Sequence, residues 1–385
     1  MIFNHRLSTE GQAIRDYVTA TLEEGRALGW LIDEDPENYR ATARYSLAHQ
    51  MNRLGLPEAY NPTPIALANG QVLHELTVVQ RCLFYEALGY VEPNLIFACP
   101  TPGMAGFVLQ GLGSPEQQER FFGLFRDQLS WSCFAMSEPT VGSDAGNIKT
   151  QATKVDGGYL INGEKYFIGN GIHADIGVVF ARTNQNSLGT DVFLFEPAKV
   201  EGFHRERLAV HGVPGCNVSH LVFEDMFVGD DALLGAHLKP TQRFSGAAIA
   251  TFDSLRPCVG ALALGSARAT LDYIVQHELM DVAYHQAWLK SAQFRLAGAL
   301  QNLLTVSARY DQGETVTKQI GLAKAKAAEL AESVVEEALH RCHGGVLLQD
   351  QTLAKLHRDI KCFEYAEGTR NVHLLNGAML FREVV

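Results

Sequence analysis

The sequence predicts an α+β fold in which helices come first, a block of β-strands follows, and long helices return. Three observations support this. Helix-capping residues recur up to residue 128, short β-branched runs alternate with glycine turns up to residue 240, and stripes of leucine and alanine follow. We therefore expect an N-terminal helical domain over 1–128, a middle antiparallel β-barrel or sandwich over 129–240, and a C-terminal helical bundle over 241–385.

The N-terminal part is predicted to contain five helices. Ser8 precedes the first, and Ser114 followed by Pro115 is typical of a helix start, because serine caps free amide groups and proline fits the first turn. We expect helices over 8–28, 36–52, 72–88 and 95–109, and a fifth that begins at Ser114.

The middle part has short runs rich in β-branched and aromatic residues, at 159–161, 176–180, 192–195, 221–223 and 226–228. Asp156-Gly157-Gly158 and Asn162-Gly163 are typical hairpin turns. Because turns recur about every ten residues and no helix lies between the runs, the pattern favours an antiparallel arrangement over a parallel sheet.

The C-terminal part shows apolar stripes at helical spacing, which are typical of antiparallel bundle helices. The two clearest stripes are Leu289, Leu296, Leu300 and Leu303, and Ala323, Ala327, Leu330, Val334 and Ala338. Pro257 lies in the segment before them, where we expect it to kink or begin a helix.

Composition narrows the classes of function. The formal net charge is -11 and no block of Lys or Arg is present, so we expect no nucleic-acid partner. We see no apolar run long enough to span a bilayer and expect no membrane association. The first residues lack a secretory pattern, and the seven cysteines are scattered, so the simplest expectation is a reduced, cytoplasmic setting.

Two segments carry residues suited to chemistry. In the first, Glu367 lies between the end of one helix and the start of another, with Gly368 as a C-cap type of residue and Thr369 as an N-cap. A carboxylate beside the negative end of a helix dipole is locally unfavourable, so this glutamate is either a residue with a chemical role or one of the solvated glutamates that are common at helix ends. The second segment, 133–146, is an apolar strand that runs into a loop able to offer amides and hydroxyls to a planar polar ligand.

These segments resemble two signatures of the acyl-CoA dehydrogenase family, and the chain looks like a diverged member. Tyr365-Ala366-Glu367-Gly368-Thr369 resembles the segment that carries the family's catalytic glutamate. The resemblance extends over nearly the whole chain, through 162–168, 223–225, 252–257 and 343–345 in the right order.

The resemblance implies FAD as cofactor and removal of two hydrogens from an acyl thioester, giving the 2,3-enoyl product. Glu367 would be the catalytic base that takes the α-proton, while the flavin N5 takes the β-hydride. The backbone N–H of Glu367 and a ribityl hydroxyl would polarise the thioester carbonyl. Closure over an acyl chain would desolvate Glu367 and raise its pKa.

The resemblance also assigns binding residues. On the cofactor it places the following: Phe134, Met136, Ser137, Gly142 and Ser143 along one side of the flavin ring, Phe167, Ile168 and Gly169 along the other, His285, Gln286, Arg341, Gly344 and Gly345 at the adenylate half across a subunit interface, and Thr369 and Asn371 near the pyrophosphate. On the substrate it places Ser143, Asp253, Arg256 and Gly368.

Four positions or segments differ from patterns found in the family. Gly169 occupies a position where a hydroxyl usually meets the flavin N5, and the segment 276–284 lacks the usual adenine clamp. Arg341 replaces the usual Gln, and could supply the lost positive charge. Leu255 stands where some subfamilies carry the base. Because leucine cannot titrate, this strengthens the assignment of Glu367 as the base.

Other candidate residues have simpler interpretations. The spacing of His340, Cys342 and His343 could suit a metal, but no further ligand set is evident, and we expect none. Glu364, one turn before Glu367, is interpreted as a solvated or ion-paired helix residue, and Asp144 as a brace of its loop.

Several functional alternatives stay open. The substrate is acyl-CoA by default or an acyl group on a carrier protein, and the resemblance implies an electron-transferring flavoprotein as partner and a homodimer or homotetramer. A flavin-dependent monooxygenase or oxidase on the same fold is one alternative; the Gly169 and adenine-clamp changes favour it, and Glu367 counts against it. A non-catalytic member of the family is another.

Overall fold

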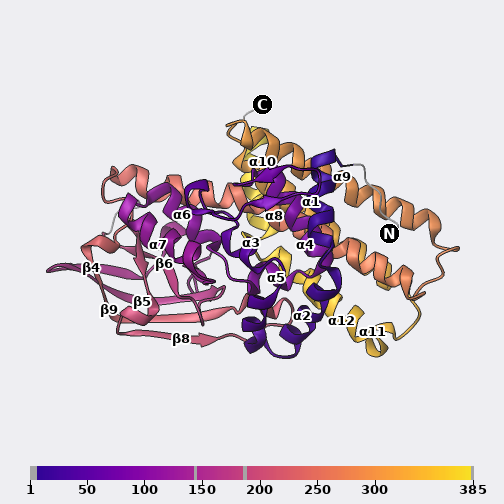
Figure 1. Cartoon of the computed structure of the whole chain (residues 1–385), viewed down its shortest axis with the longest axis horizontal. Helices are drawn as coiled ribbons and strands as arrows, with labels where there is room; N and C mark the ends of the chain where they lie inside the picture. Colours follow the sequence, from indigo (N-terminus) through magenta and orange to yellow (C-terminus); the bar gives the residue numbers. More distant parts are fainter. Residues whose placement is uncertain (1–6, 143–144, 185–188, 383–385) are drawn as a thin grey trace.

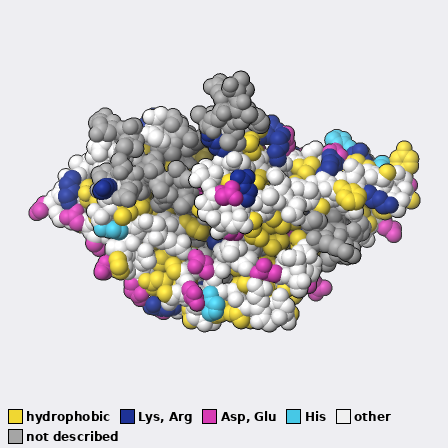
Figure 2. Space-filling view, turned by 90° about the horizontal axis from the view of Figure 1, so that it is seen from above, with side chains coloured by type: hydrophobic (Ala, Val, Ile, Leu, Met, Phe, Trp, Pro, Cys, Tyr) yellow, Lys and Arg dark blue, Asp and Glu magenta, His cyan; other side chains and the backbone are white. Residues whose placement is uncertain are grey.

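The computed structural model of the protein describes residues 7–142, 145–184 and 189–382. The strands lie at one end of the molecule and the long C-terminal helices at the other, with the N-terminal helices between them and over the sheet (Figure 1). On the face shown in Figure 2, acidic and basic side chains are interspersed with apolar ones.

The N-terminal part is helical, with one small sheet that the sequence did not predict. Its elements are α1 (Thr9–Thr19), α2 (Leu22–Glu34), the 3-10 helix η1 (Pro36–Arg44), α3 (Ala48–Arg53), η2 (Glu58–Tyr60), β1 (Ile65–Ala66), β2 (Val72–Leu73), α4 (Val78–Val91), α5 (Asn94–Ala98), α6 (Gly103–Leu112) and α7 (Pro115–Asp127). The caps predicted at Ser8 and Ser114 are confirmed, since each hydroxyl accepts a backbone N–H from the first turn of its helix.

Four predicted helices differ from the structure. The helix predicted over 8–28 is two helices, α1 and α2. The segment predicted as one helix over 36–52 is the 3-10 helix η1, followed after a break by the short α-helix α3. The helix predicted over 72–88 begins only at Val78, because Val72–Leu73 pairs with Ile65–Ala66 in a two-stranded sheet. The helix predicted over 95–109 is interrupted between α5 and α6, where Pro100 and Pro102 cannot donate helical hydrogen bonds.

The middle part is a curled seven-stranded sheet. Its strands are β3 (Ser132–Ala135), β4 (Gln151–Val155), β5 (Gly158–Ile168), β6 (Ile176–Arg182), β7 (Thr190–Phe195), β8 (Phe203–Arg207) and β9 (Ser219–Gly229). Their order is β3-β6-β4-β5-β9-β8, and β7 pairs with β6. The apolar faces of α6 and α7 share a buried cluster with one face of this sheet (Figure 1).

The prediction that an antiparallel arrangement is favoured over a parallel sheet is confirmed for most strand pairs, but the sheet is mixed. β3 pairs with β6 in parallel, and β4 meets β6 in parallel at Gln151 and Arg182, while the other pairs are antiparallel. The β3 strand reaches its partner through a long crossover that contains the β4–β5 hairpin, so the two strands run in the same direction.

Asn162-Gly163 is a β-bulge inside β5 and not the predicted hairpin turn. The side chains of Asn162 and Asp225 bond across β5 and β9 at this point. A Cβ at Gly163 would lie 2.8 Å from the Cα of Thr150, which explains the glycine by close approach. The predicted Asp156-Gly157-Gly158 turn is confirmed between β4 and β5.

The C-terminal part contains α8 (Pro240–Gln276), α9 (Gln286–Asp311), α10 (Thr317–Leu339), α11 (Val346–Gln349), α12 (Gln351–Ile360), the 3-10 helix η7 (Lys361–Glu364) and α13 (Arg370–Arg382). Helices α8, α9, α10 and α13 form the predicted bundle, in which α10 contacts each of the other three. The three long helices α8, α9 and α10 are labelled in Figure 1. Pro257 lies inside α8.

Helix α4 packs so closely along α8 that the N-terminal and C-terminal helices share one core. A Cβ at Gly89 of α4 would lie 2.2 Å from the carbonyl oxygen of Leu262, and one at Gly265 of α8 would lie 1.9 Å from that of Glu86. The shared apolar cluster runs from Ile14 to Phe363. Helix α8 is therefore the central element around which the site is built.

One stretch of α8, Thr251–Gln276, is apolar and long enough to cross a membrane, which the sequence reading did not anticipate. Its most apolar window is 89% buried within the protein. Core helices of globular proteins share this character.

Candidate active site

The segment that carries Glu367 is a left-handed turn between two helices. Glu367 has a φ of 59° and Gly368 a φ of 99°, and α13 begins two residues later at Arg370. The left-handed conformation costs a non-glycine residue about 1–2 kcal/mol, and such strain is often found at functional sites. At Gly368 a Cβ would also lie 3.0 Å from Nε2 of His373, so glycine suits this position for two reasons.

The carboxylate of Glu367 is poised to change protonation near neutral pH. Its Oε2 atom is buried, and no hydrogen-bond partner reaches it among the residues that the structure describes. Burial raises the pKa of Glu367 to about 7, and the positive charges of Arg256 and Lys324 partly offset that rise. We expected a bound acyl chain to remove Glu367 from water, but burial within the protein already raises the pKa of Glu367 before a substrate binds.

Two cations from two helices hold the backbone around Glu367. Arg256 of α8 donates from Nε to the carbonyl oxygen of Glu367 at 3.2 Å. Lys324 of α10 donates from Nζ to the carbonyl oxygens of Glu364 at 3.1 Å and of Gly368 at 2.8 Å. Lys324 was not predicted as a site residue, because it lies beside Ala323 in a stripe that was interpreted only as bundle core. A lysine on an apolar helix face could have indicated a functional position.

The predicted Asp253–Arg256 pair lies beside this turn. Nη1 of Arg256 is 3.6 Å from Oδ1 of Asp253, and Thr317 of α10 donates its hydroxyl to the other carboxylate oxygen. Burial raises the pKa of Asp253, while the Thr317 bond and the Arg256 charge oppose the rise. The guanidinium of Arg256 also lies 4.7 Å from the ring centre of Phe252.

Aromatic contacts connect this pair to the sheet. The ring of Phe252 on α8 lies 6.1 Å from that of Phe134 on β3, edge to face. Phe134 is one of the residues predicted to line the flavin ring. The base segment and the strand that begins the cofactor loop are therefore joined through Arg256, Phe252 and Phe134.

The residues predicted for the two sides of the flavin ring lie next to one another in the sheet. Met136 and Ser137 follow β3, and Phe167 and Ile168 end β5. The backbone N–H of Tyr166 donates to the carbonyl oxygen of Ser137 at 2.8 Å, which joins the two strand ends. Phe167 has a φ of 61° and is 68% exposed, so its ring is free to cover a planar partner.

A buried ion pair that the sequence reading missed braces this corner. Lys165 donates from Nζ to Glu138 at 2.9 Å and to the carbonyl oxygen of Met136 at 2.9 Å. Glu138 also accepts the backbone N–H groups of Lys149 and Thr150. Burial would raise the pKa of Glu138, but Lys165 and these amides more than offset it, whereas burial lowers the pKa of Lys165 to about 8. Glu138 lies directly after the predicted cofactor residue Ser137, and this position in the sequence could have indicated a role at the site.

The loop after Glu138 is described only in part. Gly142 is exposed, and a Cβ there would meet nothing within 4 Å. Ser143, predicted to bind both the flavin and the pantetheine arm, and Asp144 lie outside the described residues. At Gly169 a Cβ would lie 3.3 Å from Sγ of Cys216, so a larger residue there would need Cys216 to shift slightly.

The residues predicted for the adenylate half form a second group. The backbone N–H of His343 donates to the carbonyl oxygen of Leu279, which brings the 341–345 turn against the segment that leads into α9. His285 and Gln286 begin α9, Gly344 and Gly345 precede α11, and Arg341 lies over the ring of Trp288 at 4.4 Å. Helix α11 lies at the end of the molecule opposite the sheet (Figure 1), far from the residues predicted to line the flavin ring. The role of this second group across a subunit interface stays a prediction.

The start of α13, predicted to approach a pyrophosphate through Thr369 and Asn371, already carries a carboxylate. Glu364 accepts the backbone N–H of Arg370 at 2.7 Å and thereby caps the helix. The sequence reading interpreted Glu364 as a solvated or ion-paired residue; the structure corrects this to a capping residue.

In the described part of the chain, no group of three or more metal-ligating side chains lies together.

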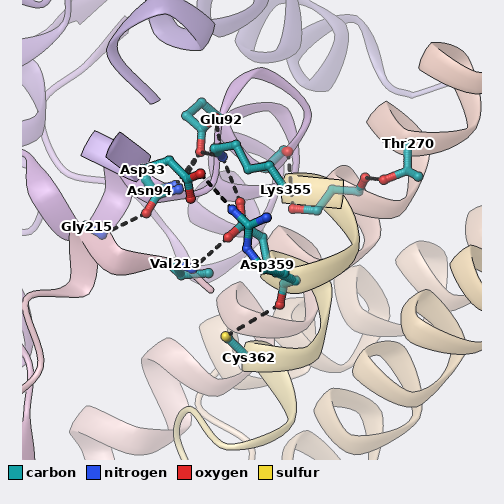
Figure 3. Close-up of polar contacts among 12 residues, drawn as sticks. Asp33, Glu92, Asn94, Val213, Gly215, Thr270, Lys355, Asp359 and Cys362 are labelled. Atoms are coloured by element: carbon teal, nitrogen blue, oxygen red, sulfur yellow. Dashed lines mark hydrogen bonds and ion pairs between the residues drawn. The ribbon is translucent and has the colours of Figure 1, made fainter. Parts of the chain in front are cut away.

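Helix α12, which leads into the base segment, is anchored by a buried charge network (Figure 3). Lys355 donates to both oxygens of Glu92 at 2.9 Å and to Asp359 at 2.7 Å. Asp359 in turn accepts the backbone N–H of Val213 at 2.6 Å, from the loop between β8 and β9. The network therefore ties the N-terminal helices, the β domain and the base segment together.

Comparisons with known proteins agree with this architecture. Residues 133–226 match the family model of the acyl-CoA dehydrogenase middle domain, and residues 245–380 match that of the acyl-CoA dehydrogenase C-terminal domain. The chain is 30% identical over 329 residues to the short-chain specific acyl-CoA dehydrogenase of Megasphaera elsdenii, with 81% of this chain and 82% of that protein covered.

Two further comparisons extend the match. The chain is 32% identical over 288 residues to the acryloyl-CoA reductase (NADH) of Anaerotignum propionicum, with 71% of each chain covered. The solved structure of butyryl-CoA dehydrogenase from Megasphaera elsdenii has the same fold, with a TM-score of 0.80, 24% identity, and 98% of this chain and 100% of that chain covered. The chain therefore belongs to the acyl-CoA dehydrogenase family and is an FAD-dependent oxidoreductase that acts on CH–CH groups.

Proposed function

We propose that the protein removes two hydrogens from the α and β carbons of an acyl-CoA, with Glu367 as the base, and releases the 2,3-enoyl thioester. The observation that supports this most strongly is the Glu367 carboxylate, which has a buried, unpartnered oxygen and a pKa raised to about 7 by burial. A general base is most effective when its pKa lies near the working pH.

The residues of the sheet corner fit the isoalloxazine ring of FAD. Phe167 exposes most of a large aromatic side chain beside Ile168, and Phe134 lies on strand β3, with Met136 directly after that strand. The left-handed backbone at Phe167 is a strained conformation of the kind that clusters at ligand sites, and a flat apolar group over its exposed ring would remove apolar surface from water. FAD supplies the acceptor for the β-hydride when bound.

The protein's own groups then have separate tasks. Glu367 takes the α-proton, and its backbone N–H polarises the thioester carbonyl, which makes that proton more acidic. Arg256 fixes the carbonyl of Glu367 from the opposite side of the peptide. Asp253 and Arg256 are placed to contact the carrier portion of the thioester.

A second candidate direction of reaction has one specific observation in its favour. The relative from Anaerotignum propionicum is named as a reductase of an acryloyl-CoA. Run in that direction, protonated Glu367 would donate the α-proton, and a pKa near 7 suits a donor as well as an acceptor.

The test is an anaerobic titration of the yellow protein with a panel of acyl-CoA and carrier-protein thioesters, with flavin bleaching as the readout. We expect one or more saturated thioesters to bleach the wild-type flavin, and Glu367→Gln to bind FAD without being bleached. The control is Glu224→Gln, an exposed carboxylate on β9, which should bleach normally. Normal bleaching of Glu367→Gln would overturn the assignment of the base. Bleaching of the wild type only by a reduced nicotinamide would favour the reductase direction.

A further inference from the structure

We propose that Lys324 is a positioning residue, which holds the base segment in its left-handed turn by clamping the carbonyl groups on either side of Glu367. This inference deepens the proposed function and rests on Glu367 being the base.

The placement of Lys324 needs a functional explanation because it is energetically unfavourable. Its side chain is 0% exposed, and its helical neighbours Ala323, Ala327 and Ala328 are buried and apolar. An ammonium group removed from water needs strong partners, and an apolar residue would fill this position at lower cost. The partners that Lys324 finds are two backbone carbonyls of a loop, and not a carboxylate.

The two carbonyls bracket the base. Lys324 bonds to the carbonyl oxygen of Glu364, three residues before Glu367, at 3.1 Å, and to that of Gly368, directly after it, at 2.8 Å. Both bonds come from one atom, Nζ, so they fix the separation of the two ends of the turn. Arg256 holds the carbonyl of Glu367 itself at 3.2 Å from another helix.

This clamp explains how a strained turn keeps one conformation. Glu367 has a φ of 59°, which a free chain avoids in a residue other than glycine. Such conformations persist when the surrounding structure over-determines them. Helices α8 and α10 supply that constraint through Arg256 and Lys324, so the carboxylate points in one direction before substrate arrives.

Lys324 also acts on the charge of the base. The titratable groups that surround Glu367 and Lys324 are Tyr85 from α4, Arg256 and Cys258 from α8, Glu364 from η7 and His373 from α13. Burial raises the pKa values of Tyr85 and Cys258 and lowers that of His373 to about 4, so these three are neutral between pH 5.5 and 8. Burial lowers the pKa of Lys324 to about 8, so Lys324 is mostly protonated at pH 7, where the base titrates. Arg256 and Lys324 are then the cations that favour ionised Glu367.

The experiment compares Lys324→Met with Lys326→Met in the FAD-bound protein. Lys326 lies on the same helix but is exposed and pairs with Glu329, so it is the matched control. Anaerobic stopped-flow measures the limiting rate of flavin reduction, the KM for the thioester and the rate between pH 5.5 and 8. Lys324→Met should lower the limiting rate by about 100-fold at little change in KM, because a base misplaced by about 1 Å loses that much.

A second readout separates positioning from a merely structural role. Loss of the Lys324 charge should move the acid limb of the rate profile to higher pH, because one of the two cations that favour ionised Glu367 is gone. Lys324→Gln, which keeps a donor without the charge, should recover part of the limiting rate but keep the shifted limb. Lys326→Met should change neither property.

The outcomes test the role of Lys324 and the role of Glu367 as the base separately. If Lys324→Met and Lys324→Gln bind FAD and show the wild-type rate and profile, Lys324 is not a positioning residue, whatever Glu367 does. If the limiting rate falls but the acid limb stays at the wild-type pH, the loss reflects a structural defect and the proposal also fails. If Glu367→Gln is reduced at the wild-type rate, the proposed function fails first.

Discussion

Arg256 and Glu367 are joined through the peptide backbone and not through a direct bond between their charged groups. Nε of Arg256 lies 3.2 Å from the carbonyl oxygen of Glu367, while Nη1 of the same guanidinium lies 3.6 Å from Asp253. One planar group thus spans the predicted carrier-binding carboxylate and the peptide of the base. A planar guanidinium can serve two acceptors at fixed angles, whereas an ammonium concentrates its charge at one point.

This geometry predicts that Arg256→Lys is not a conservative change. The positive charge near Glu367 is kept, so the pH at which the base ionises should move little, but one of the two contacts must be lost. We expect the rate of flavin reduction by the thioester to fall about 10- to 100-fold. Stopped-flow reduction across pH 5.5 to 8 measures both quantities, and a variant with an unchanged rate would show that the backbone contact is dispensable.

Burial of Glu367 predicts that the base costs stability, and that this cost depends on pH. Burial raises the pKa of Glu367 from about 4.5 in the unfolded chain to about 7 in the folded protein, so the folded protein holds the carboxyl proton more tightly. The free energy of unfolding is therefore unaffected by this group below pH 4.5 and falls as pH rises from 4.5 through 7. Above that pH the cost is about 3 kcal/mol. Glu367→Gln should therefore be more stable than the wild type at pH 8.5 and nearly equal to it at pH 4.5.

Urea unfolding of both proteins at the two pH values checks this prediction, with Glu224→Gln as the control for an exposed carboxylate. An equal difference in the free energy of unfolding at pH 4.5 and 8.5 would contradict a raised pKa for Glu367. The comparison needs no substrate, so it is independent of the catalytic assignment.

The sequence was most informative where residues act locally. Ser8 and Ser114 cap helices through contacts within one turn, and the Glu367–Gly368 break is visible because a carboxylate and a glycine meet between two helical patterns. The sequence was misleading where pairing is distant. Val72–Leu73 looked like part of a helix because its strand partner, Ile65–Ala66, is set by chain folding and not by local preference.

The same limit explains which site residues escaped prediction. Lys324 lies in an otherwise apolar helical stripe and Lys165 in a strand with polar neighbours, and neither pattern shows which distant carbonyl or carboxylate neutralises a buried cation. Their partners, Gly368 and Glu138, lie 44 and 27 residues away. The parallel pairing of β3 with β6 was hidden for a similar reason, since strand order follows from the crossover between them.

The buried Glu138–Lys165 pair predicts a link between stability and cofactor binding. Lys165→Met leaves the Glu138 carboxylate buried without its cation, which costs about 3–5 kcal/mol. It also frees the carbonyl of Met136 beside the predicted flavin site, so we expect weaker FAD binding. The double variant Glu138→Gln/Lys165→Met should lose less than the sum of the single losses.

Urea unfolding and fluorescence titration of the apoprotein with FAD measure these two effects. Lys154→Met is the matched control, because Lys154 lies on β4 of the same sheet and its exposed pair with Asp230, directly after β9, should contribute at most about 1 kcal/mol. Strictly additive losses in the Glu138 and Lys165 variants would show that the two side chains do not act as a pair.

The Glu92–Lys355–Asp359 network predicts a strongly asymmetric response to mutation (Figure 3). Burial alone would lower the pKa of Lys355, but the charges of Glu92 and Asp359 outweigh burial and raise it; burial raises the pKa of Asp359. Lys355→Met leaves two buried carboxylates without their cation, so we expect a loss of about 3–5 kcal/mol at pH 8. The loss should shrink toward pH 5, because the unpaired carboxyl groups can then be protonated.

The triple variant Glu92→Gln/Lys355→Met/Asp359→Asn removes all three charges and should recover most of that stability at pH 8, because no uncompensated charge stays buried. Urea unfolding of the single and triple variants at pH 5 and 8 measures both effects. Since Asp359 also holds the backbone of Val213, a triple variant that recovers stability but loses the yellow colour would show that this contact orients the β domain toward the base segment. A Lys355→Met loss that is the same at both pH values would instead assign the network to packing and not to charge.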